Sequence, residues 1–191
     1  MSGSNEKLDR AVVAAGEVFL RYGYVRTTMG DIAKAAGMSR AALYLLFPGK
    51  EQAFAAATMA LATRRLDEIR AAVGPCQGLR DKLTTGCVML LVRVFELQQT
   101  TPDARDMDDL AFPVVREIYA MFEAFFAGII AKAAPAQAIS AETAARVLLY
   151  GARGLREVAD CPATYTALIE AHVALFCDGI YPAGASAVTR S

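Results

Sequence analysis

Residues 37–51 of the chain, GMSRAALYLLFPGKE, predict a short helix with well-marked ends. Ser39 is a good N-cap, because its hydroxyl can accept a hydrogen bond from a free backbone amide of the first turn. Pro48 and Gly49 end the helix after Phe47. A helix this short is not stable in isolation, so neighbouring segments must supply the packing that holds it.

The segment before it, residues 28–36, predicts a second short helix. Thr28 followed three residues later by Asp31 is close to a capping box, and Gly37 can adopt the left-handed backbone that ends a helix. Two short helices joined by a glycine-containing turn form a helix-turn-helix. The residues expected to face inward are apolar and include small alanines that permit close crossing: Ile32, Ala33, Ala36, Leu43, Leu46 and Phe47.

The outward side of the helix at residues 39–47 suits the major groove of DNA. Arg40 can bind a guanine edge or a phosphate, Tyr44 can donate to a phosphate, and Lys50 can neutralise another. Taken singly, Arg40 and Lys50 could be solvated and Tyr44 a half-buried core residue, but their joint spacing favours DNA binding. The candidate DNA-binding residues are Thr27, Thr28, Ser39, Arg40, Ala41, Tyr44 and Lys50.

Charge is distributed unevenly along a chain whose formal net charge is zero. Residues 1–50 carry seven basic and four acidic side chains, whereas residues 71–191 carry ten basic and thirteen acidic ones. This asymmetry indicates an anionic partner for the N-terminal part.

The remainder of the chain predicts an all-α fold with no strand-like alternation. The acidic run DARDMDD, residues 103–109, is expected to be a solvated loop containing a short helical turn, with a metal site as a remote second interpretation. Longer helices are expected at 6–22, 50–72, 78–99, 110–134, 140–159 and 163–180.

Nothing in the sequence indicates catalysis or a cofactor, and no metal site is expected apart from the remote interpretation of the acidic run. The chain has a single histidine and four cysteines without C-x-x-C spacing, and it shows no nucleophile–base pair and no phosphate-binding loop. It has no apolar run long enough to span a membrane and no signal peptide at its start. We therefore expect a cytoplasmic protein that is not an enzyme.

The stretch TTMGDIAKAAGMSRAALYLLFPGKEQAF, residues 27–54, resembles the DNA-binding signature of the TetR (tetracycline repressor-like) transcription regulators. The shared elements are an I-A pair after the threonines, a G-M-S turn, L-Y at the centre of the recognition helix, and F-x-x-K-E at the start of the next helix. The chain departs from this pattern at Leu45 and Leu46, where relatives often carry aromatic or His side chains. We expect Leu46 in the core. We expect Leu45 to be exposed, at a position where the family pattern would place a hydrogen-bond donor.

The resemblance implies a homodimer whose N-terminal helices bind the half-sites of a near-palindromic operator. It implies a helix-turn-helix DNA-binding domain at residues 1–50 and a helical ligand-binding and dimerisation domain at 51–191. A small molecule bound by the second domain would release a repressor from DNA. Aromatic and Met-rich segments in that domain suit an apolar or aromatic effector.

Residues for both roles can be named in the C-terminal part. The candidate ligand-binding residues are Met89, Arg93, Tyr119, Phe122 and Phe126, although aromatic residues at helical spacing are more often core. The last two long helices each have a second apolar side, which indicates a subunit contact, a single monomeric core being the alternative. The candidate dimer residues are Val147, Gly151, Leu155, Leu168, His172 and Phe176.

Two other functions stay open at this point. One is a thiol-based redox sensor on the same scaffold, using Cys87 or Cys161. The other is a helical protein-interaction module whose N-terminal helices are incidental.

Overall fold

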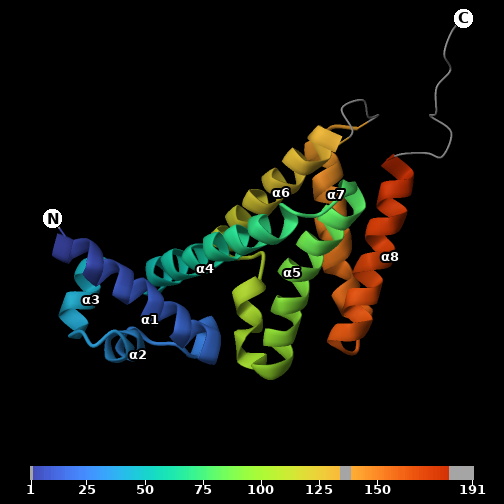
Figure 1. The fold of residues 1–191 in the computed structure, drawn as a ribbon. Coiled ribbons are helices and arrows are strands. Elements are labelled where there is room, and N and C mark those ends of the chain that lie inside the picture. Colours follow the sequence, from blue (N-terminus) through green and yellow to red (C-terminus); the bar gives the residue numbers. More distant parts are fainter. Residues whose placement is uncertain (1, 134–138, 181–191) are drawn as a thin grey trace, which may run out of the picture. The chain divides into compact units, whose positions relative to one another are not determined.

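The computed structural model describes residues 2–133 and 139–180, and all regular structure within them is helical (Figure 1). The predicted all-α fold with an N-terminal helix-turn-helix is confirmed. Among these residues no helix combines the length and the apolar character that membrane crossing requires. The helices are α1 (Ser2–Arg26), α2 (Met29–Ala35), α3 (Arg40–Leu46), α4 (Lys50–Val73), α5 (Gly78–Thr100), the 3-10 helix η1 (Pro102–Asp108), α6 (Pro113–Ala133), α7 (Ala141–Gly154), the 3-10 helix η2 (Leu155–Val158) and α8 (Pro162–Ile180).

The chain divides into two compact units, each built from two stretches of sequence. The first unit comprises Met1–Leu66 and Glu96–Tyr119, and the second comprises Asp67–Phe95 and Ala120–Ser191. Helices α4, α5 and α6 therefore contribute residues to both units. The unit that contains the helix-turn-helix thus takes in residues well beyond the expected boundary at residue 50.

Helix α1 is interrupted at Gly23, which the sequence indicates as its end. Gly23 has φ 70° and ψ 176°, a backbone conformation that essentially only glycine adopts. The chain resumes a helical turn that ends at Arg26.

An aromatic cluster packs around this interruption in the first unit. The rings of Tyr24 and Phe54 lie 4.9 Å apart, and those of Tyr24 and Phe112 lie 4.8 Å apart. Phe19 packs edge-on against Phe54 at 5.1 Å. These separations are those of favourable aromatic pairs, so the cluster joins α1, α4 and the start of α6.

The second unit is held by close helix contacts and one buried hydroxyl. Gly86 on α5 lies against Phe126 on α6, and a Cβ at Gly86 would fall 2.7 Å from the Phe126 ring. Tyr165 on α8 is 1% exposed, and its hydroxyl donates to the backbone oxygen of Ala152 on α7 at 3.2 Å. Because both partners are buried, this hydrogen bond satisfies a hydroxyl that would otherwise be costly to bury.

Candidate nucleic-acid interface

The start of α2 is fixed by a complete capping box. The Thr28 hydroxyl accepts from the Asp31 amide at 3.2 Å and donates to the Asp31 carboxylate at 2.6 Å, while the Thr28 amide donates to the same carboxylate at 3.0 Å. The side-chain and backbone hydrogen bonds from Thr28 lower the pKa of Asp31, and Arg40 and Lys34 lower it further. The predicted cap is therefore confirmed, and the Thr28 hydroxyl proton is committed to Asp31.

The turn between α2 and α3 follows from the glycine. Gly37 has φ 63°, and the amides of Gly37 and Met38 donate to the backbone oxygens of Lys34 and Ala33. This is the paired hydrogen-bond pattern of a helix that ends at a left-handed glycine. The turn sets α3 across α2 with Leu43 fully buried.

Helix α3 presents one side to the core and the other to solvent. Ser39 caps it by accepting from the Ala42 amide at 3.1 Å. Leu43 and Phe47 are buried, whereas Tyr44 is 50% exposed and Leu45 is 88% exposed. The outward residues are Arg40, Ala41, Ala42, Tyr44 and Leu45.

Arg40 reaches back from α3 over the first turn of α2. Its guanidinium lies directly against Gly30, where any Cβ would collide with it. It also contributes to the charge around Asp31. Gly30 thus makes room for an exposed guanidinium beside the N-terminus of α2, a suitable position for contact with a phosphate.

Besides Thr28, the predicted DNA-binding residues Thr27 and Lys50 also make structural contacts with their donors. Thr27 is 1% exposed, and its hydroxyl donates to the Gly23 backbone oxygen at 2.6 Å. The Lys50 ammonium donates to the Tyr24 backbone oxygen at 2.9 Å and lies 4.3 Å from the centre of the Tyr24 ring. In this structure both side chains stabilise the backbone at the end of α1 and the start of the connection to α2.

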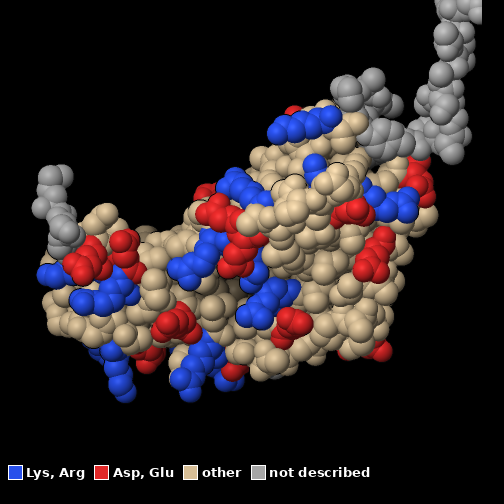
Figure 2. Space-filling view, viewed as in Figure 1, with Lys and Arg blue, Asp and Glu red and all other residues tan. Residues whose placement is uncertain are grey.

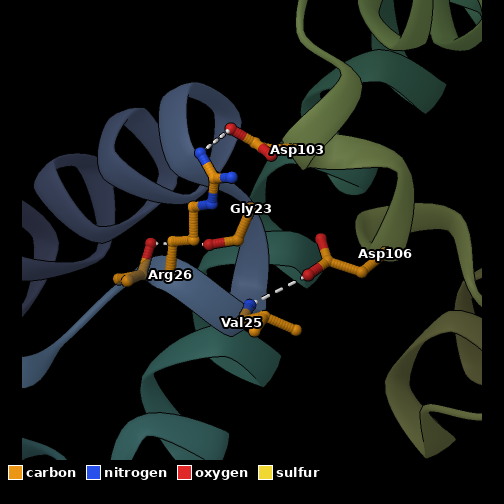
Figure 3. A network of polar contacts seen from close by, with 6 residues as sticks. Gly23, Val25, Arg26, Asp103 and Asp106 are labelled. Carbon is orange, nitrogen blue, oxygen red and sulfur yellow. Dashed lines mark hydrogen bonds and ion pairs between the residues drawn. The ribbon is translucent and has the colours of Figure 1, made fainter.

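The acidic segment was expected to be a solvated loop containing a short helical turn; the helical turn is present, but the segment also makes contacts that the sequence analysis did not predict. Residues Pro102–Asp108 form η1, and Asp106 accepts hydrogen bonds from the amides of Tyr24 and Val25, both at 2.9 Å. Figure 3 shows the one from Val25. Asp103 pairs with Arg26 at 2.6 Å. These amides are free to donate because the backbone turns at Gly23. Sequence spacing does not reveal that Asp106 accepts from them.

Charged side chains of both signs are scattered over the visible surface of the molecule. Figure 2 shows Lys and Arg side chains projecting from the edge of the molecule where α2 lies in Figure 1, with acidic side chains beside them. The interface is thus not uniformly basic. Whether a basic side chain can contact DNA depends on its place on the helix-turn-helix as well as on its charge.

The candidate ligand-binding residues do not all lie in one unit. Phe122 and Phe126 are buried, Met89 is half-buried and Arg93 is exposed, all in the second unit. Tyr119 lies in the first unit, where its buried hydroxyl donates to Asp108 at 2.9 Å. Tyr119 nevertheless lies on the same helix, α6, as Phe122 and Phe126.

The candidate dimer residues lie along α7, η2 and α8. Val147 is 54% exposed and Gly151 is also exposed, while the other four are half-buried: Leu155, Leu168, His172 and Phe176. The His172 ring packs on Gly151, and its Nε2 lies 3.1 Å from the Leu148 backbone oxygen. Val158 and Leu175 are more exposed, at 72% and 74%.

The cysteines differ sharply in accessibility. Cys87 is completely buried, and that burial raises the pKa of its thiol to about 12. Cys161 is exposed before α8. Because the thiolate is the reactive form, Cys87 is poorly suited to react at neutral pH.

The fold is the one found in helix-turn-helix transcription regulators. Residues 11–57 match the family model of bacterial regulatory proteins of the tetR family. The match includes residues 27–54, where the sequence resembles the TetR regulators, and so confirms that resemblance.

Solved structures with the same fold cover nearly the whole chain. A transcriptional regulator from Cytophaga hutchinsonii is 21% identical, with a TM-score of 0.71 over 91% of this chain and 98% of that one. The fatty acid degradation regulator FadR from Bacillus halodurans is 20% identical, with a TM-score of 0.66 over 92% and 96%. FadR from Bacillus subtilis, solved in complex with stearoyl-CoA, is 18% identical, with a TM-score of 0.63 over 91% and 99%. No curated protein sequence matches the chain.

Proposed function

We propose that this protein is a cytoplasmic, dimeric, ligand-responsive repressor that binds a near-palindromic operator through α3. The observation that carries the proposal is the outward side of α3, where Arg40 and Tyr44 stand on a helix held by a serine cap and a buried leucine. Two such helices in a symmetric dimer would enter the major groove roughly 34–36 Å apart.

The effector we propose is an apolar or aromatic small molecule bound in the C-terminal domain, residues 51–191. The aromatic side chains Phe122 and Phe126 of α6 are apolar groups suited to contact such a ligand. FadR from Bacillus subtilis was solved with stearoyl-CoA, so long-chain acyl-CoA is the first ligand to test. A ligand that prefers a conformation unable to match the half-site spacing would shift the population away from the DNA-bound state.

The test of DNA binding uses the full chain and the DNA that flanks its own gene, followed by fluorescence anisotropy over a range of salt concentrations. We expect Arg40→Ala to weaken binding and, if Arg40 contacts a phosphate, to reduce the salt slope by about one. Glu51→Ala, an exposed change on α4, is the control. Equal affinity of wild type and Arg40→Ala would contradict this interface.

The test of the effector adds stearoyl-CoA or coenzyme A alone to the preformed complex. Release by the acylated compound only would support an apolar effector site. Persistence of the complex with both would exclude this acyl-CoA, while leaving DNA binding intact.

A further inference from the structure

We propose that Leu45 on α3 binds the 5-methyl group of a thymine in the major groove, beside Ala41, which makes Leu45 a determinant of operator sequence. This inference rests on the proposed DNA binding and adds to it the chemical identity of one base. It concerns the residue at which the chain departs from the pattern of its relatives.

The exposure of Leu45 is imposed by the rest of α3. Leu45 is 88% exposed, while Leu43, two positions earlier, is completely buried. Successive helical residues are about 100° apart, so Leu43 and Leu45 point to nearly opposite sides. The Ser39 cap and the burial of Phe47 fix both ends of the helix, so Leu45 cannot turn inward without displacing the core.

The outward side of α3 contains two parallel lines of residues. Arg40 and Tyr44, four residues apart, form a polar line, and Ala41 and Leu45 form an apolar line beside it. Ala41 leaves space at the start of the apolar line, where a base edge can approach the backbone. Leu45 then offers a flexible apolar group one turn further along.

The partner of the apolar line is defined by chemistry. A surface leucine gains free energy only when apolar atoms cover it. The thymine 5-methyl is the one methyl group that a base presents in the major groove, where the other bases show hydrogen-bond donors and acceptors and, in cytosine, only the small C5–H. The polar line holds the helix to DNA, so the adjacent apolar line faces the same groove.

The experiment begins by selecting duplexes from a random library with the wild-type full chain. We expect an invariant thymine in each half-site. Replacing that thymine by deoxyuridine removes only the methyl group, and we expect binding to weaken roughly fourfold for each methyl removed. The salt slope should not change, because no phosphate contact is lost.

Matched variants then assign the effect to Leu45. In Leu45→Ala the thymine and uracil duplexes should bind with the same affinity, while Leu45→Ile should retain the preference. Val13→Ala, which shortens a 48% exposed valine on α1, should also retain it. Circular dichroism should show unchanged helicity in all three, because each altered side chain is largely exposed.

The possible failures are distinguishable. If no sequence is selected, the proposed DNA binding fails and this inference fails with it. If sequences are selected but uracil binds as well as thymine at every position, the inference alone is overturned. A thymine preference that survives in Leu45→Ala would assign the methyl contact to another residue and also overturn it.

Discussion

Gly23 and Gly37 show that one residue type can be required for different physical reasons. Gly37 has φ 63°, but a Cβ placed there would meet no atom within 4 Å. Gly23 has a backbone conformation outside the range of other residues, and its Cβ position is occupied by the backbone oxygen of Asp103. Gly37 is thus needed for conformation alone, whereas Gly23 is needed both for conformation and for the space that Asp103 occupies.

We therefore expect Gly23→Ala to destabilise the protein more than Gly37→Ala. Gly37→Ala should cost about 1–2 kcal/mol, the penalty of a left-handed alanine. Gly23→Ala should incur about 1–3 kcal/mol for its backbone alone and a further cost for displacing η1. Urea denaturation of the two variants checks this, and equal midpoints would show that the Asp103 contact adds nothing.

The same scale shows where sequence reasoning on single residues ends. The exposure of Leu45 and the caps of Thr28 and Ser39 depend on neighbours within one or two turns, so local spacing predicts them. Lys50 is different, because the carbonyl oxygen it reaches is 26 residues away. Its position after Pro48-Gly49 is compatible with a phosphate contact and with this internal one, and only the folded chain distinguishes them.

At the scale of elements, helices were predictable and one connection was not. Helix α4 was expected at 50–72 and is observed at Lys50–Val73, because apolar periodicity and the Gly74-Pro75 stop are both local signals. The contact of η1 with the end of α1 joins residues about 80 positions apart. Its acidic composition is equally typical of a solvated loop, so composition alone does not reveal the contact.

The carboxylate of Asp106 should protect two amides from hydrogen exchange. It accepts from Tyr24 and Val25 at 2.9 Å each, so Asp106→Ala should accelerate exchange at both. Hydrogen bonds to charged groups contribute about 1.5–3 kcal/mol. Asp106→Asn, which keeps one acceptor oxygen, should accelerate exchange less.

A control for this prediction lies in the same acidic segment. Asp109 accepts from the Ala111 amide at 2.8 Å, a contact within its own loop. Asp109→Ala should therefore leave exchange at Tyr24 and Val25 unchanged. If Asp106→Ala also left it unchanged, the contact would not persist in solution.

At the scale of the whole molecule, the second unit carries apolar residues that its own core does not use. Val147, Gly151, Gly154 and Val158 follow one another at spacings of four, three and four along α7 and η2, and all are exposed. On α8, which packs against α7, Ala171 and Leu175 are exposed as well. A regular apolar stripe of this kind is typical of a helix surface that is covered by a partner, and we propose that a second copy covers it.

Replacing Val147 and Leu175 together by glutamate should convert the dimer to a monomer without unfolding it. In a single chain these side chains are 54% and 74% exposed, so the new carboxylates would be solvated. In a dimer they would be buried without partners, which is strongly unfavourable. Sedimentation equilibrium would show the mass of one chain, and circular dichroism would show unchanged helicity. Val13→Glu, at a 48% exposed site on α1, should leave the dimer intact. A dimer that withstands the double glutamate variant would place the subunit contact elsewhere.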